Sequence, residues 1–85
     1  MSCYLVQERP ERQLVAGYDR PLRQVFGRAR GIAGTVHRTG PIFSPDTAHT
    51  AVARLSDWLR EQGAAEADIT RVAADLISDC EDDLS

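Results

Sequence analysis

A change in the spacing of apolar residues at Gly40-Pro41 divides the sequence into two halves of different character. Before this point the apolar residues occur in short runs interrupted by proline and glycine, which is typical of strands and turns. After it they recur every three or four residues over two long stretches, which is typical of amphipathic helices. We therefore predict a mainly β half, residues 1–40, and a mainly α half, residues 41–85, within one domain of 85 residues.

The second half opens with a well-defined helix start. Ser44 supplies an N-cap hydroxyl, Pro45 stands at the first helical position, and Asp46 places a carboxylate near the positive end of the helix dipole. We expect this helix to end at Gly63 as a C-cap. A second helix is predicted from the helical spacing of its apolar residues, namely Ile69, Val72, Ala73, Leu76, Ile77 and Cys80. The two helices should pack as an antiparallel pair.

The first half predicts an antiparallel sheet. The runs YLVQER (4–9) and QLVAGY (13–18), separated by a turn that contains proline, indicate a β-hairpin, and TVHRT (35–39) indicates a further strand. The expected fold class is α+β, with a small antiparallel sheet of three to four strands packed against the C-terminal helix pair.

Residues 20–30 allow two interpretations. In one, Asp19 caps a short helix; in the other, Asp19-Arg20-Pro21 is a tight turn that leads into a strand with Leu22 and Phe26 as core contacts. Glycines at 27, 31 and 34, which we expect to mark turns or bulges, favour the strand. The stretch GYDRPLR (17–23) resembles an Asp-x-Pro-Leu turn followed by a strand in small uncharacterised bacterial or phage proteins. This resemblance covers seven residues and implies no activity.

Several chemistries lack their motifs in this chain. The glycine spacing does not form G-x-G-x-x-G, the absence of lysine excludes a P-loop, and no G-x-S-x-G elbow is present. Cysteines and histidines, at positions 3, 37, 49 and 80, do not occur at the paired spacings of metal ligands. We therefore expect no catalytic residues, no metal and no cofactor, and we expect free thiols at Cys3 and Cys80.

Charge is segregated between the two halves. Residues 1–40 carry seven arginines against three acids, a net charge of +4, whereas residues 41–85 carry three arginines against ten acids, a net charge of −7. The whole chain has a formal net charge of −3, which is unfavourable for simple DNA binding because that binding requires a cationic surface. A divided charge distribution instead indicates recognition of a charged partner by one face.

These observations predict a non-enzymatic protein-interaction module that binds a basic partner surface, as small acidic proteins do when they occupy nucleic-acid-binding surfaces, including some phage-encoded inhibitors of bacterial defence. The predicted acidic face consists of Asp68, Asp75, Asp79, Glu81, Asp82 and Asp83, with Asp57, Glu61 and Glu66 from the neighbouring helix as further candidates. The alternative is a small nucleic-acid-binding regulator that uses Arg20, Arg23, Arg28, Arg30 and Arg38. A third hypothesis is a homodimer that joins the basic half of one copy to the acidic half of another. The sequence offers no apolar run of membrane-spanning length, and we expect a cytoplasmic protein.

Overall fold

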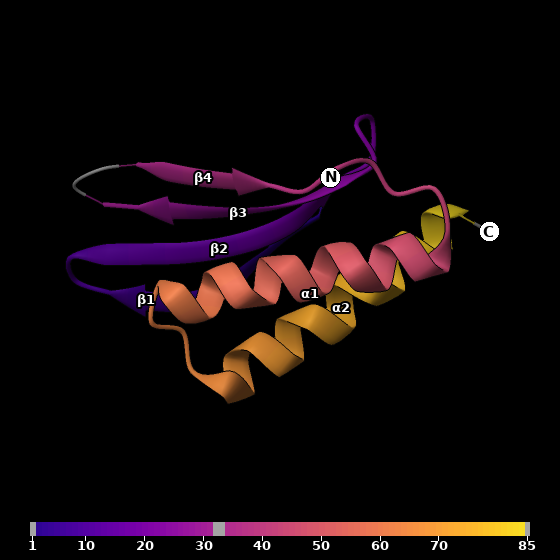
Figure 1. The fold of residues 1–85 in the computed structure, drawn as a ribbon. Coiled ribbons are helices and arrows are strands. Elements are labelled where there is room, and N and C mark those ends of the chain that lie inside the picture. Colours follow the sequence, from indigo (N-terminus) through magenta and orange to yellow (C-terminus); the bar gives the residue numbers. More distant parts are fainter. Residues whose placement is uncertain (1, 32–33, 85) are drawn as a thin grey trace.

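The computed structural model describes residues 2–31 and 34–84 and contains a four-stranded sheet followed by two helices (Figure 1). The strands are β1 (Ser2–Arg9), β2 (Arg12–Asp19), β3 (Gln24–Arg30) and β4 (Thr35–Arg38), and the helices are α1 (Pro45–Glu61) and α2 (Glu66–Leu84). The strands pair antiparallel in the order β1-β2-β3-β4. This arrangement confirms the predicted α+β fold class.

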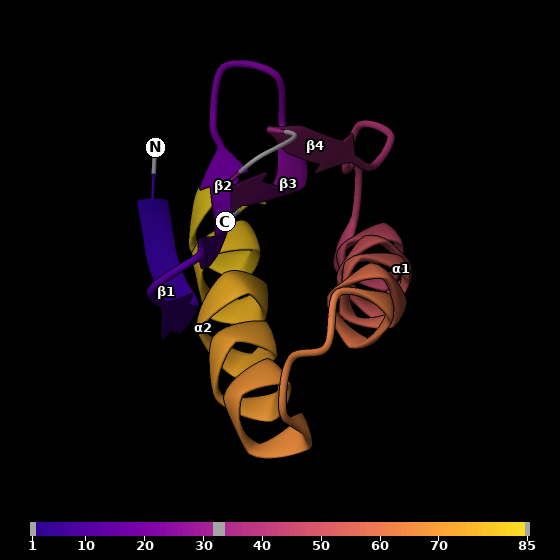
Figure 2. The same cartoon turned by 90° about the vertical axis from the view of Figure 1, so that its left-hand side faces the viewer.

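Both helices cover the same face of the sheet. Helix α1 packs against β3 and β4, whereas α2 packs against β1 and β2. Figure 2, in which the sheet is seen nearly end-on, shows it curving over the helix pair. No helix in the described part of the chain lies over the opposite face, so that side chains on it are available to solvent or to a partner.

The core lies between the sheet and the helices. Leu14, Ala16 and Tyr18 alternate along β2 and point toward the helices, as expected for a sheet that is covered on one face. Helix α2 contributes Ile69, Val72, Leu76 and Cys80, which are all buried. Complete burial of an apolar side chain as large as isoleucine or leucine stabilises the fold by about 1.5–3 kcal/mol.

Helix α1 begins where the sequence predicts, and its C-cap lies one residue before the predicted Gly63. Thr47 N–H donates to Ser44 Oγ at 3.3 Å, and Ser44 N–H donates to Thr47 Oγ1 at 2.9 Å, so the two residues form a reciprocal capping box ahead of Pro45. Gln62 is the C-cap, and Gly63 follows with a φ of 91°. Glycine adopts this left-handed conformation without a steric penalty, which explains its position at the end of the helix.

The strand interpretation of residues 20–30 is confirmed from Gln24 onward, but the predicted core contacts are wrong in part. Leu22 is 54% exposed because it belongs to the turn, where its N–H points to Asp19 Oδ1 at 3.5 Å. The turn continues to Arg23, which has a φ of 50°, and the strand begins one residue later. Val25 therefore faces the helices opposite Tyr18, whereas Phe26 lies on the other face of the sheet, where it is nevertheless only 4% exposed.

Gly27 lies inside β3 rather than at a turn, which corrects the prediction that it marks a break. A Cβ atom at this position would lie 2.5 Å from Trp58 Cζ3 and 2.8 Å from Leu55 Cδ1. Because such distances are far inside van der Waals contact, only glycine lets α1 approach the sheet this closely.

Candidate functional site

The acidic end of α2 is bonded to the sheet. Tyr4 Oη donates to Asp79 Oδ2 at 2.5 Å, and Tyr18 Oη donates to Asp83 Oδ2 at 2.5 Å. The tyrosines belong to β1 and β2, so these two carboxylates hold the last turns of α2 against two neighbouring strands. Asp79 and Asp83, which the sequence assigned to the partner-binding face, therefore form part of the packing between helix and sheet.

These contacts change the acidity of the tyrosine hydroxyls. The hydrogen bond to Asp79, together with burial, raises the pKa of Tyr4 to about 12. Burial, together with the hydrogen bond to Asp83, raises the pKa of Tyr18 further above its ordinary value. In both cases ionisation would remove the donated proton and place a phenolate beside a carboxylate.

Asp83 also binds the turn between β2 and β3. Its Oδ1 lies 3.0 Å from Arg20 Nε, and its Oδ2 lies 4.0 Å from Arg23 Nε. Arg20 and Arg23 were predicted as members of the alternative nucleic-acid-binding set. The structure instead places them beside a carboxylate of the same chain, so their charge is partly neutralised there.

The other predicted acids remain on the outer side of the helices. Glu81 Oε1 lies 3.9 Å from His49 Nε2, and Asp68 Oδ1 lies 3.7 Å from Arg71 Nη2. Asp75 and Asp82 are exposed. A further cluster lies near the turn between the helices, where Arg60 binds both Asp57 and Glu66. We call this outer side the acidic helical surface; it consists of Asp57, Glu61, Glu66, Asp68, Asp75, Glu81 and Asp82.

The remaining predicted arginines gather on the sheet face that the helices leave uncovered. Cross-strand partners share one face of a sheet, and the register places Leu5, Val15, Arg28 and Val36 in one row across all four strands. A neighbouring row contains Phe26 and Arg38, and another contains Arg30. We call this side the uncovered sheet face; it consists of Leu5, Val15, Phe26, Arg28, Arg30, Val36 and Arg38.

On this face the guanidinium group of Arg38 lies over the ring of Phe26. The guanidinium carbon of Arg38 lies 5.4 Å from the centroid of the Phe26 ring, and Arg38 Nη1 lies 3.5 Å from Asp19 Oδ2. On the adjacent strand β2, a Cβ atom at Gly17 would lie 2.8 Å from Phe26 Cζ. The ring is thus accommodated beside a glycine and covered by a guanidinium, which explains its low exposure.

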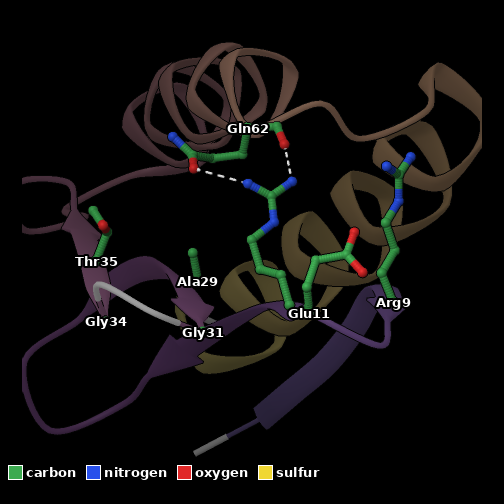
Figure 3. A pocket seen from close by; sticks show the side chains of 8 residues that line it. Arg9, Glu11, Ala29, Gly31, Gly34, Thr35 and Gln62 are labelled. Carbon is green, nitrogen blue, oxygen red and sulfur yellow. Dashed lines mark hydrogen bonds between the residues drawn. The ribbon is translucent and has the colours of Figure 1, made fainter.

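Residues in the described part of the chain line one hollow near the turn between β1 and β2 and another at the opposite end of these strands. The larger has a volume of about 430 Å³ and is lined by Arg9, Glu11, Arg12, Ala29, Gly31, Gly34, Thr35 and Gln62 (Figure 3). Arg12 donates to both the side-chain and the main-chain carbonyl oxygen of Gln62, so this guanidinium fastens β2 to the end of α1. The smaller, of about 260 Å³, is lined by Ser2, Tyr18, Arg20, Asp79 and Asp82 and adjoins the bonded end of α2.

The histidines and cysteines lie apart. His37 stacks on Trp58 with ring centroids 5.5 Å apart, and His49 lies beside Glu81. Cys3 is exposed and Cys80 is buried, and neither forms a disulfide. Burial, with the neighbouring Asp79 and Asp83 carboxylates, raises the pKa of the Cys80 thiol to about 11. Within residues 2–31 and 34–84, no group of three or more histidine, cysteine or acidic side chains could hold a metal ion.

The role of the two tyrosines is not evident from the sequence. Acids in the last turn of a helix oppose its dipole, and α2 has no basic residue there. That unfavourable placement is a signal that carboxylates bind something else, but it does not identify Tyr4 and Tyr18, which are 75 and 65 residues away along the chain.

No protein-family model, curated protein or solved structure matches this chain. None of the helices in the described ranges is long and apolar enough to cross a membrane. Function is therefore proposed from the charged surfaces that the fold creates.

Proposed function

We propose that the protein is a non-enzymatic interaction module whose acidic helical surface binds a basic surface on a partner protein, in competition with nucleic acid. The observation that supports this proposal is that the carboxylates of α2 differ in what they contact. Asp79 and Asp83 bind the tyrosines of the sheet, whereas Asp75 and Glu81 remain exposed on the same helix.

The exposed acids lie on a rigid support. Because α2 is held to β1 and β2 by the two tyrosine hydroxyls, its outer carboxylates keep a fixed spacing before a partner arrives. A surface that is already ordered loses less conformational entropy on binding, and more of the interaction energy appears as affinity.

Arginines of the same chain neutralise part of this surface, since Arg60 pairs with Asp57 and Glu66 and Arg71 pairs with Asp68, but they do not reach Asp75 and Glu81. Among the described residues Asp75 has no hydrogen-bond or ion-pair partner and Glu81 has no arginine partner; Glu81 Oε1 lies 3.9 Å from His49 Nε2. Arg54 on α1 is exposed and has no carboxylate within ion-pair distance in the described ranges. A surplus of exposed carboxylates attracts arginine-rich surfaces over several ångströms and accelerates their association.

The test measures binding of a fluorescently labelled oligo-arginine peptide by anisotropy. The variant Asp75→Asn/Glu81→Gln leaves both tyrosine bonds in place and should weaken binding about tenfold, since each exposed pair contributes up to about 1 kcal/mol. The wild-type affinity should also fall steeply with added salt. In a competition assay the wild-type protein should displace labelled duplex DNA from the same peptide.

The matched control is Glu8→Gln/Glu11→Gln. It removes the same amount of charge, but from the end of β1 and from the turn that leads to β2, outside the acidic helical surface. If control and test variants lose equal affinity, binding reflects net charge alone and the acidic helical surface is not a site. If the peptide binds without displacing DNA, the proposed competition is wrong.

A further inference from the structure

The uncovered sheet face combines exposed apolar side chains with guanidinium groups. In its central row Leu5 is 44% and Val36 is 47% exposed, and Arg28 lies between Val15 and Val36. These residues come from four different strands, so the face exists only in the folded sheet. It lies on the opposite side of the sheet from the acidic helical surface and is independent of the function proposed above.

Two of its arginines have no carboxylate partner within residues 2–31 and 34–84. Arg28 and Arg30 form no ion pair or hydrogen bond with any described residue, whereas Arg38 is shared between Asp19 and the Phe26 ring. Glu8 is separated from Arg30 by Gln13 in the row across β1, β2 and β3. The face therefore presents two uncommitted guanidinium groups flanked by aliphatic surface.

We propose that this face binds an acidic segment of a partner protein in which apolar side chains stand between the carboxylates. Arginine suits this role because its planar guanidinium donates two parallel hydrogen bonds to a carboxylate. The apolar side chains of the segment would cover the exposed surface of Leu5 and Val36. This burial adds a hydrophobic contribution to the binding free energy that salt does not screen.

The same observations disfavour nucleic acid as the occupant. Binding of single strands relies on aromatic rings on which bases stack, and the aromatic side chain of this face, Phe26, is nearly buried beneath Arg38. Phosphate gains nothing from the exposed Leu5 and Val36, and the chain as a whole is negatively charged. An identical face on a second copy would bring Arg28 and Arg30 against like charge.

The experiment compares three labelled probes: a peptide in which glutamates alternate with leucines, an oligo-glutamate of equal charge, and a single-stranded oligonucleotide. The wild-type protein should bind the mixed peptide most tightly. Arg28→Gln/Arg30→Gln should weaken that binding about tenfold or more, and Leu5→Ser/Val36→Ser should weaken it severalfold while leaving oligo-glutamate binding nearly unchanged.

The control Arg9→Gln/Arg54→Gln removes the same charge from exposed positions outside this face and should retain the wild-type affinity. Circular dichroism and urea unfolding verify that each variant is folded. Tighter binding of the oligonucleotide than of the mixed peptide, with loss in Arg28→Gln/Arg30→Gln, would assign the face to nucleic acid and overturn the proposal. Equal losses in test and control variants, no binding of the mixed peptide, or light-scattering evidence that the same face joins copies of the chain would also overturn it.

Discussion

Tyr18 and Asp83 join the sheet to the end of α2 by a hydrogen bond of 2.5 Å, and the other oxygen of the same carboxylate lies 3.0 Å from Arg20 Nε. One side chain thus connects a central strand, the turn that follows it and the last helix. Because the carboxylate is largely shielded while the arginine is exposed, the bond to Tyr18 should contribute more to stability than the ion pair.

Removal of the Tyr18 hydroxyl should destabilise the fold. We expect Tyr18→Phe to lower the free energy of unfolding by about 1–2 kcal/mol, since Asp83 loses its shielded donor. A double-mutant cycle with Asp83→Ala, measured by urea unfolding, should give a coupling energy of at least about 0.5 kcal/mol. Additive effects of the two substitutions would show that the hydrogen bond does not stabilise the protein.

The raised tyrosine pKa values predict a loss of stability at alkaline pH. Tyr4 titrates at about 12 in the folded protein, against an ordinary value of 10.0, so the folded state retains the proton that the unfolded chain releases. This contribution to stability is fully present below pH 10 and is lost as the pH rises toward 12. Urea unfolding across this window should show the decline, and Tyr4→Phe should reduce it. A flat profile in the wild-type protein would contradict the assigned hydrogen bonds.

The close approach of α1 to β3 should not tolerate a side chain at Gly27. Gly27→Ala would place its Cβ 2.5 Å from the Trp58 ring, and we expect a loss of about 2–4 kcal/mol because the helix must move away from the sheet. Gly40→Ala is the matched control, since a Cβ at this position meets nothing within 4 Å. Thermal unfolding should separate the two variants clearly. Equal midpoints would mean that the interface is loosely packed.

How well each element can be predicted from the sequence depends on how far apart along the chain the residues lie whose contacts determine it. The capping box at Ser44, the left-handed Gly63 and the first hairpin are encoded by neighbouring residues, so all three are predictable. The side of the sheet to which each β3 side chain points is not predictable in this way, because it depends on where the preceding turn ends. Ile42 N–H donates to the carbonyl oxygen of Arg23 at 2.7 Å, and a contact between such distant residues has no local sequence signature.

The candidate site shows the same limit. The spacing of acids along α2 predicts a charged face, but the period alone does not distinguish Asp79, which binds Tyr4, from Asp75, which is exposed one turn earlier. Both stand on a helix with similar neighbours in sequence. Only the position of β1 beside the helix separates a carboxylate that bonds to the sheet from one that remains exposed.

This separation predicts opposite effects for substitutions within one helix. Asp79→Asn should lower the free energy of unfolding by about 1–2 kcal/mol, because the charged acceptor of the Tyr4 hydroxyl is replaced by a neutral amide. Glu81→Gln should leave stability unchanged or raise it by a few tenths of a kcal/mol, since it removes an acid that opposes the helix dipole. Oligo-arginine binding, measured on the folded proteins, should show the reverse order, with the larger loss in Glu81→Gln. If both substitutions weaken binding equally without changing stability, the division of α2 into a structural side and a binding side is wrong.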